Sequence, residues 1–265
     1  ITQGAALPAE PAGSRDMTQK PMSSYYIWNT AIGSGAVWSA ATDTDTQSVT
    51  TATQSAINCG FFSSPINIGR STDPLGGVSF ANTPNSVFVG NVTGVHIPAN
   101  AIADPSPPGD RCIALIDATS PHNIYTGFNG AVSSGSVSIG NGLVIDQFNG
   151  FNNAMLQEQG HAVGILRAAE ITAAATNVQA FSHMLQYQMA TNFIRGGDSN
   201  VSGLSWPAFA SDASGGTGGY TGGPGALLYG STLCIPSNVA MPSTITTPEG
   251  KALWWTCQNY GLMMN

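Results

Sequence analysis

Charged residues are scarce in this sequence. Asp, Glu, Lys and Arg make up 8% of the 265 residues, against roughly 25% in a typical soluble domain. The surface must therefore be covered largely by uncharged polar groups and glycine, which suits a secreted protein because few groups change charge as pH falls. The net charge is −7 and the seven basic residues form no run. This balance argues against nucleic acid or a membrane surface as a partner, because both are recognised through clustered basic residues.

Long apolar runs and cofactor motifs are absent as well. No stretch of 18 apolar residues occurs, so no membrane-spanning segment is expected. The sequence contains no nucleophile elbow, no phosphate-binding loop, no dinucleotide fingerprint and no metalloprotease motif. Its cysteines do not have the spacing of zinc ligands. We therefore expect neither a metal ion nor a cofactor.

Cysteine is rare but even in number, with Cys59, Cys112, Cys234 and Cys257. An even count in a low-charge, glycine-rich chain predicts two disulfides and an oxidising compartment. Three pairings are possible, and proximity in sequence favours Cys59–Cys112 and Cys234–Cys257. The chain starts at Ile1, and we expect an extracellular protein from which a secretory leader has been removed.

Short apolar segments separated by glycine and asparagine dominate the middle of the chain. Residues 87–97 alternate, and further strands are expected at 112–118, 124–128, 136–139 and 143–148. Their regular spacing predicts an all-β fold, an antiparallel β-sandwich or barrel of the jelly-roll type. One short C-terminal helix is expected at about 248–260, because Thr247 can cap it, Pro248 suits its first turn and Gly261 can stop it.

Two segments fit more than one structure. Residues 41–56 fit either a polar helix or an edge strand. Residues 161–195 fit a helical stripe through Phe181 and Leu185, and they fit strict alternation equally well; their aromatic residues favour a strand. Residues 1–24, rich in proline and glycine, predict an irregular arm. Residues 25–265 show neither a repeat nor a change of composition, so one β-rich domain is expected there.

The densest group of ionisable residues is His161, Arg167, Glu170 and His183. In a chain this poor in charge, an ionised group beside apolar residues is usually paired or functional. One interpretation makes Glu170 a catalytic carboxylate, held by Arg167 and close to the imidazole of His183. The alternative is a buried Arg–Glu pair that only fixes a loop.

Two aspartates are candidates for a second catalytic carboxylate. Asp117 ends a buried strand, and Asp212 heads a glycine-rich loop; the alternatives are a turn aspartate that caps backbone N–H groups and an ordinary loop residue. Sugar rings stack on aromatic side chains. Tyr125, Trp206 and Tyr220 are therefore candidate substrate-binding residues, together with His161.

Several short motifs follow one another in a fixed order: Tyr25, Trp28, Asn29 and Ile32; Asp110 to Asp117; Gly164 to Glu170; Ser182 to Leu185; Trp206 to Ala208 with Asp212; and Ala252 to Gly261. Together they resemble a group of secreted, largely uncharacterised bacterial and fungal proteins that are often attached to carbohydrate-related modules. The resemblance implies that Arg167, Glu170 and His183 belong to one site.

These observations favour a secreted enzyme that degrades a polysaccharide or oligosaccharide. The leading hypothesis is a glycoside hydrolase, which needs two carboxylates about 5 to 10 Å apart, with Glu170 as the acid and Asp117 or Asp212 as its partner. The alternative is a lyase acting on a uronic-acid polymer, in which Arg167 neutralises the uronate and His183, His161 or a tyrosine takes the C5 proton. A third hypothesis is a non-catalytic carbohydrate-binding or structural surface protein.

Overall fold

The computed structural model describes residues 16, 22, 26–33, 35–51, 65–82, 91–105, 111–119, 123–146, 164–187, 189–195, 205, 220–223 and 225–264. The chain divides into two compact units. Unit 1 comprises residues 1–26, 57–154 and 158–163, and unit 2 comprises residues 27–56, 155–157 and 164–265. The expectation of a single domain over residues 25–265 stays a prediction, and each unit is described by itself.

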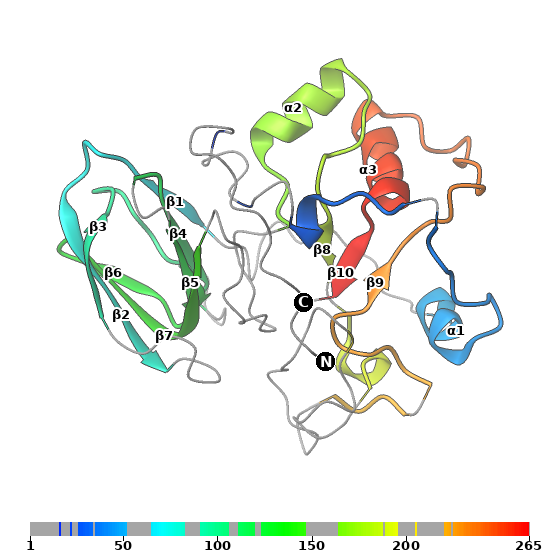
Figure 1. Ribbon diagram of the computed structural model, residues 1–265, viewed down its shortest axis with the longest axis horizontal. Coiled ribbons are helices and arrows are strands. Elements are labelled where there is room, and N and C mark those ends of the chain that lie inside the picture. The colour runs from blue at the N-terminus through cyan, green and yellow to red at the C-terminus, as the bar shows by residue number, and fades with distance from the viewer. Residues whose placement is uncertain are drawn as a thin grey trace. The chain divides into compact units, whose positions relative to one another are not determined.

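Unit 1 is built on one seven-stranded sheet (Figure 1). Its strands are β1 (Ile66–Gly69), β2 (Leu75–Asn82), β3 (Val92–His96), β4 (Ile113–Asp117), β5 (Asn123–Phe128), β6 (Ala131–Ser133) and β7 (Ser136–Asp146). The strand order is β1-β4-β5-β7-β2-β3, with β6 paired to β7. β1 runs parallel to β4 and β2 runs parallel to β7, whereas the remaining pairs are antiparallel.

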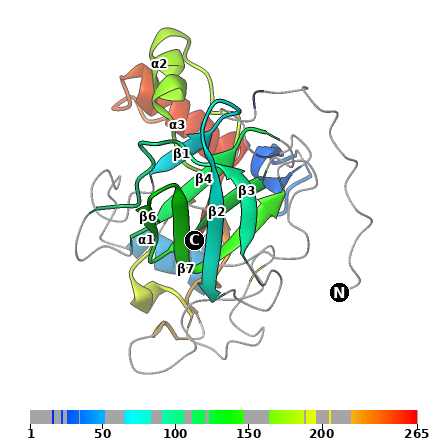
Figure 2. The ribbon, with the colours of Figure 1, turned by 90° about the vertical axis from the view of Figure 1, so that its left-hand side faces the viewer.

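The sheet curls until its two edge strands approach each other (Figure 2). A Cβ built on Gly69, the last residue of β1, would lie 1.9 Å from the carbonyl oxygen of His96, the last residue of β3. Only glycine leaves room for this approach. Gly69 also pairs in register with Asp117 at the end of β4. His96 and Asp117 therefore come together where the sheet closes on itself, a point we call the seam.

One apolar cluster fills the inside of the curled sheet. Its buried members come from β2, β3, β4, β5 and β7 and include Val78, Val95, Leu115, Tyr125 and Ile139. Every residue of β4 is buried, which explains why this segment reads as a continuous apolar run rather than an alternating one. The buried strand ends at Asp117, so a carboxylate is fixed at the border of the core.

Unit 2 combines helices with a small sheet. It contains η1 (Ile27–Asn29), α1 (Thr44–Thr51), α2 (Ala168–Thr176), η3 (Thr191–Phe193) and α3 (Pro248–Asn259). Its sheet has the order β8-β10-β9, from β8 (Leu185–Tyr187), β10 (Leu262–Met264) and β9 (Thr232–Leu233). α2 and α3 contribute to one buried cluster through Ala174 and Ala252, together with Phe181 and Leu185. None of the helices in the described ranges has the length and apolar character that crossing a membrane requires.

The expected C-terminal helix is confirmed. In α3, the Thr247 side chain accepts a hydrogen bond from the Gly250 N–H at 3.1 Å, Pro248 occupies the first turn, and Gly261 follows the helix with φ +82°. These are the local signals of an N-cap, a first-turn proline and a left-handed glycine after the last turn. Glu249 in the first turn adds a favourable interaction with the helix dipole.

The prediction of an all-β antiparallel sandwich or barrel is wrong. Over its described residues, the chain has a mixed sheet with parallel pairs, a second mixed sheet and three α-helices. The strand favoured for residues 161–195 is also wrong over most of its described length, since 168–176 are helical and only 185–187 form a strand. Alternation identifies strands but says nothing of their direction, and the alanine-rich segment 168–176 gave no periodic stripe to mark a helix.

Among the described residues, Cys234 and Cys257 are free thiols, Cys112 is buried, and Cys59 lies outside the described residues. The pairing Cys59–Cys112 therefore falls partly on a residue that is not described. Cys234 and Cys257 lie close together. The N–H of Ile235, the residue after Cys234, donates a hydrogen bond to the Cys257 carbonyl oxygen at 3.1 Å. The disulfides stay a prediction, and no S–S bond joins these two residues in the structure.

Candidate functional site

Three side chains form a hydrogen-bonded chain at the seam of unit 1. The Thr119 hydroxyl lies 2.6 Å from Oδ1 of Asp117 and 2.8 Å from Nδ1 of His96. The Thr119 N–H also donates to Oδ1 of Asp117 at 2.9 Å. Asp117 is 1% exposed and His96 is 19% exposed. The carboxylate therefore belongs to the protein interior, while the imidazole reaches the surface.

This geometry fixes where the protons lie. Thr119 donates its single hydroxyl hydrogen to Oδ1 of Asp117. Nδ1 of His96 must then carry a hydrogen and donate it to the Thr119 oxygen. Nε2 has no hydrogen-bond partner among the described residues. In its neutral form, the ring thus presents an open, proton-accepting nitrogen, oriented by a carboxyl group through a hydroxyl.

Further groups surround the hydrogen-bonded side chains of His96, Thr119 and Asp117. Oδ2 of Asp117 is buried and has no hydrogen-bond partner among the described residues, an arrangement that is costly and uncommon outside functional sites. Burial raises the pKa of Tyr125 and the Asn123 hydrogen bond lowers it, while the charge of nearby Asp117 raises it further, so the phenol stays neutral. Arg70, which is exposed, directly follows Gly69, and the carbonyl oxygen of Gly69 accepts from the Ala118 N–H at 2.9 Å.

The second candidate site lies in unit 2 at the start of α2. Oε1 of Glu170 lies 2.9 Å from Nε2 of His183, and Oε2 accepts from the backbone N–H of Arg167, the N-cap residue, at 3.0 Å. Nδ1 of His183 lies 2.9 Å from the carbonyl oxygen of Met184. Both ring nitrogens thus face acceptors, and both can donate only when the ring is an imidazolium. The pair ties the first turn of α2 to His183, two residues before β8.

Several opposing effects set the ionisation of Glu170. Burial of the carboxyl raises its pKa, but the hydrogen bond and charge of His183, the Arg167 N–H and the Arg167 guanidinium lower it more. The net result is a pKa of Glu170 below the ordinary value. Its carboxylate is therefore ionised at neutral pH, as a base or an ion-pair partner requires and as a general acid does not.

The structure brings only some of the predicted site residues together. Glu170, His183 and Arg167 meet in unit 2, as the resemblance implied, whereas Asp117 belongs to unit 1. The carboxylate pair that would join Glu170 to Asp117 is thus split between units whose relative placement is not described, and it stays a prediction.

The predicted sugar-binding residues differ in their location and exposure. Tyr125 is fully buried in the core of the sheet, and Tyr220 stacks on Tyr229 with ring centroids 5.7 Å apart. Neither ring is open on both faces. His161, Trp206 and Asp212 lie outside the described residues.

Sequence reasoning missed His96 and Thr119. His96 closes an alternating strand, which marks it as the polar end of β3, but nothing local links it to a threonine 23 positions later. The sequence did contain one signal for this site, the carboxylate of Asp117 at the end of a continuous apolar run. The residues that contact Asp117 could not be predicted, because they depend on how the sheet curls.

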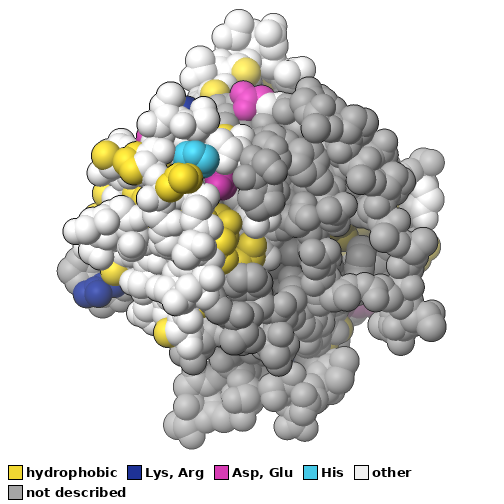
Figure 3. Space-filling model, turned by 60° about the vertical axis from the view of Figure 1, so that its left-hand side comes forward, with side chains coloured by type: hydrophobic (Ala, Val, Ile, Leu, Met, Phe, Trp, Pro, Cys, Tyr) yellow, Lys and Arg dark blue, Asp and Glu magenta, His cyan; other side chains and the backbone are white. Residues whose placement is uncertain are grey.

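Charged side chains are sparse among the described residues on the face of the molecule that Figure 3 shows. Within the described ranges, no group of three or more His, Cys, Asp or Glu side chains is placed to hold a metal ion.

Comparisons with known proteins give no information on the function of this chain. The chain matches no protein-family model, no curated protein and no solved structure. The resemblance to secreted proteins associated with carbohydrate-related modules therefore stays a prediction.

Proposed function

We propose that this chain is a secreted enzyme that degrades a polysaccharide, and that His96 is its general base. The observation that carries the proposal is the open Nε2 of His96, whose Nδ1 is held by Thr119 and Asp117 at the seam. A base oriented by a second group that is itself fixed is the arrangement that proton-transfer catalysis needs. The polysaccharide as substrate rests on the uncharged polar composition and on the absence of cofactor and nucleophile motifs.

This site favours elimination over hydrolysis. Hydrolysis with a carboxylate pair needs one carboxyl that is protonated, and Glu170 has a lowered pKa and gives both oxygens to protein partners. Elimination from a uronic-acid polymer needs a base and a cation instead. His96 supplies the base, and exposed Arg70, adjacent to Gly69 at the seam, supplies the cation.

The step can be written in full. The Arg70 guanidinium neutralises the uronate carboxylate and thereby makes the C5 proton more acidic. Nε2 of His96 takes that proton, the C–H electrons form the C4–C5 double bond, and the C4–O glycosidic bond breaks. The imidazolium then returns its proton to the leaving oxygen. Asp117 stabilises the imidazolium through Thr119.

The test is a comparison of two histidine variants. Wild-type protein is incubated with polygalacturonate, alginate and glucuronan, and the unsaturated product is followed by its ultraviolet absorbance. His96→Ala is expected to lose about 10²-fold or more in rate, whereas His183→Ala keeps the catalytic base. Thr119→Val keeps the base but loses its support, so a smaller loss of about 10- to 100-fold is expected.

Three results would count against the proposal. Loss of activity in His183→Ala but not in His96→Ala would move the chemistry to unit 2. Saturated product detected by mass spectrometry would show hydrolysis. Binding of a glycan without any product, in protein of verified fold, would favour the non-catalytic carbohydrate-binding hypothesis.

A further inference from the structure

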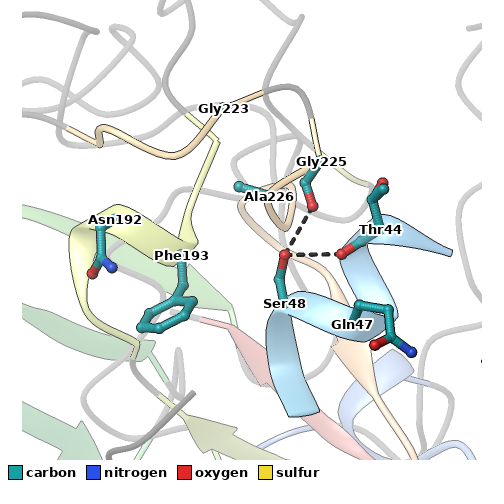
Figure 4. Close-up of a pocket in the computed structure, with 8 residues that line it drawn as sticks. All are labelled: Thr44, Gln47, Ser48, Asn192, Phe193, Gly223, Gly225 and Ala226. Atoms are coloured by element: carbon teal, nitrogen blue, oxygen red, sulfur yellow. Dashed lines mark hydrogen bonds between the residues drawn. The ribbon is translucent and has the colours of Figure 1, made fainter. Parts of the chain in front are cut away.

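A hollow of about 410 Å³ opens on unit 2, within the size range of roughly 300–1,000 Å³ that small-molecule sites have. One wall is the face of α1 that carries Thr44, Gln47 and Ser48. The opposite wall is Asn192 and Phe193 of η3, and Gly223, Gly225 and Ala226 line the hollow between these walls (Figure 4). None of the described residues that line the hollow has an ionisable side chain.

We propose that this hollow binds a neutral sugar unit of a glycan chain. The inference rests on the proposed function for the kind of ligand, but it does not depend on the reaction. The lining supplies what a neutral pyranose needs: an aromatic face for the C–H side of the ring, and amide and hydroxyl groups for its hydroxyls. A polymer that contains both kinds of unit could supply a uronate unit to the seam and a neutral unit to this hollow.

The polar groups of the lining differ in their availability. The Ser48 hydroxyl lies 2.9 Å from the Thr44 carbonyl oxygen and 3.0 Å from that of Gly225, and the Gln47 amide donates to the Ala41 carbonyl oxygen. These groups are engaged in holding α1 in place. The side chains of Thr44 and Asn192, both exposed, have no hydrogen-bond partner among the described residues. The two residues line the hollow on opposite walls, so their side chains are available to a ligand.

The uncharged character of the described lining residues favours a neutral ligand. A uronate, sulfate or phosphate placed here would lose water without gaining a cation, which is costly. A neutral sugar loses less on desolvation and recovers its hydrogen bonds from Thr44 and Asn192. The half-buried ring of Phe193 offers the apolar contact.

The walls of the hollow are fixed by close packing. A Cβ on Gly225 would lie 2.8 Å from Cβ of Thr44, so Gly225 rests directly on α1. Gly223 differs, because a Cβ there would meet nothing within 4 Å. A leucine at 223 therefore starts in open space at the wall, and it can obstruct the hollow without displacing the backbone.

The experiment measures binding of cellohexaose, xylohexaose and mannohexaose to the full chain by isothermal titration calorimetry. Wild-type protein is expected to bind at least one of them. Asn192→Ala should weaken that binding about fivefold, as expected for the loss of one hydrogen bond, and Gly223→Leu should weaken it about tenfold or more. Gly35→Leu is the matched control, because Gly35 also has nothing within 4 Å of its Cβ and does not line the hollow.

The outcomes separate this inference from the proposed function. If His96→Ala abolishes cleavage but binds the hexasaccharide normally, both proposals hold. If no neutral hexasaccharide binds to a protein that still cleaves a uronate polymer, the hollow is not a sugar site and the proposed function survives. If binding occurs but is unchanged in both Asn192→Ala and Gly223→Leu, or weakened equally in Gly35→Leu, the inference is overturned.

Discussion

Replacing Glu170 with glutamine is expected to destabilise unit 2 rather than to remove a catalytic group. In the structure the carboxylate receives a hydrogen bond from His183 at 2.9 Å and one from the Arg167 N–H at 3.0 Å. Glutamine keeps one oxygen for the Arg167 N–H, and its NH₂ group can donate to a neutral His183 ring. The variant therefore loses the charge-assisted part of the contact with His183 and keeps the helix cap.

The size of the effect follows from burial. The His183 and Glu170 side chains are 15% and 21% exposed, so their interaction is only partly screened by water. Hydrogen bonds to charged groups contribute about 1.5–3 kcal/mol, and the glutamine contact recovers part of this, which leaves a loss of about 1–2 kcal/mol at neutral pH.

The pH dependence provides a second check. The pKa of Glu170 is lowered in the folded state, so the ionised carboxylate stabilises the fold fully above the unfolded value of about 4.3. That contribution is lost as pH falls through the lower folded pKa. The stability difference between wild type and Glu170→Gln should therefore shrink below about pH 4.

Tryptophan fluorescence during urea unfolding is the appropriate assay. All five tryptophans fall in the residue ranges of unit 2, so the signal reports on that unit. Glu249→Gln is the matched control, because Glu249 lies in the first turn of α3 without a histidine partner, and its dipole interaction contributes about 0.3–1 kcal/mol. A double-mutant cycle with His183→Ala isolates the pairwise term. An unchanged unfolding midpoint combined with lost activity would refute the structural role and restore Glu170 as a catalytic residue.

Three further predictions concern other parts of the chain. Gly69→Ala should destabilise unit 1 and disturb His96, because the new Cβ would overlap the His96 carbonyl oxygen; circular dichroism melting monitors this, and an unchanged melting temperature would contradict the closure of the sheet. In fully reduced protein, Cys234 and Cys257 should react with iodoacetamide about 10²-fold more slowly at pH 7.5 than an ordinary thiol. The reason is that burial, and for Cys234 also the charge of Cys257, raises the pKa of each thiol to about 11. Rapid labelling of both thiols in the folded state would show that they are exposed. Thr247→Ala should cost about 1 kcal/mol through loss of the α3 cap, and a urea midpoint equal to that of wild type would show that the cap is dispensable.

Local signals explain which elements the sequence could predict. α3 carries its start and stop in Thr247, Pro248 and Gly261, all within reach of the helix ends. β4 is recognisable because five buried residues follow one another before Asp117. In both cases the information lies within about a dozen residues.

The rest of the fold depends on distant contacts or on unusual caps. α2 begins at Arg167, which is not a typical capping residue, and its cap comes from Glu170 inside the helix. The contact between Glu170 and His183 could be anticipated as a shared site but not as an ion pair. The chain from His96 through Thr119 to Asp117 could not be anticipated, because it exists only after β1 has paired in parallel with β4.

The seam also affects how the chain acquires its candidate site during folding. Ile66 of β1 pairs with Ala114 of β4, 48 positions later, and β3, which lies between them in the sequence, occupies the opposite edge of the sheet. Pairings over such separations are slow, because loop-closure entropy is lost before the contacts form. His96 meets Asp117 only when both edges are in place. During synthesis, a nascent chain therefore cannot form the contacts among His96, Thr119 and Asp117 until β4 has emerged and the sheet has closed. On refolding, any activity that depends on His96 should return no earlier than the seven-stranded sheet.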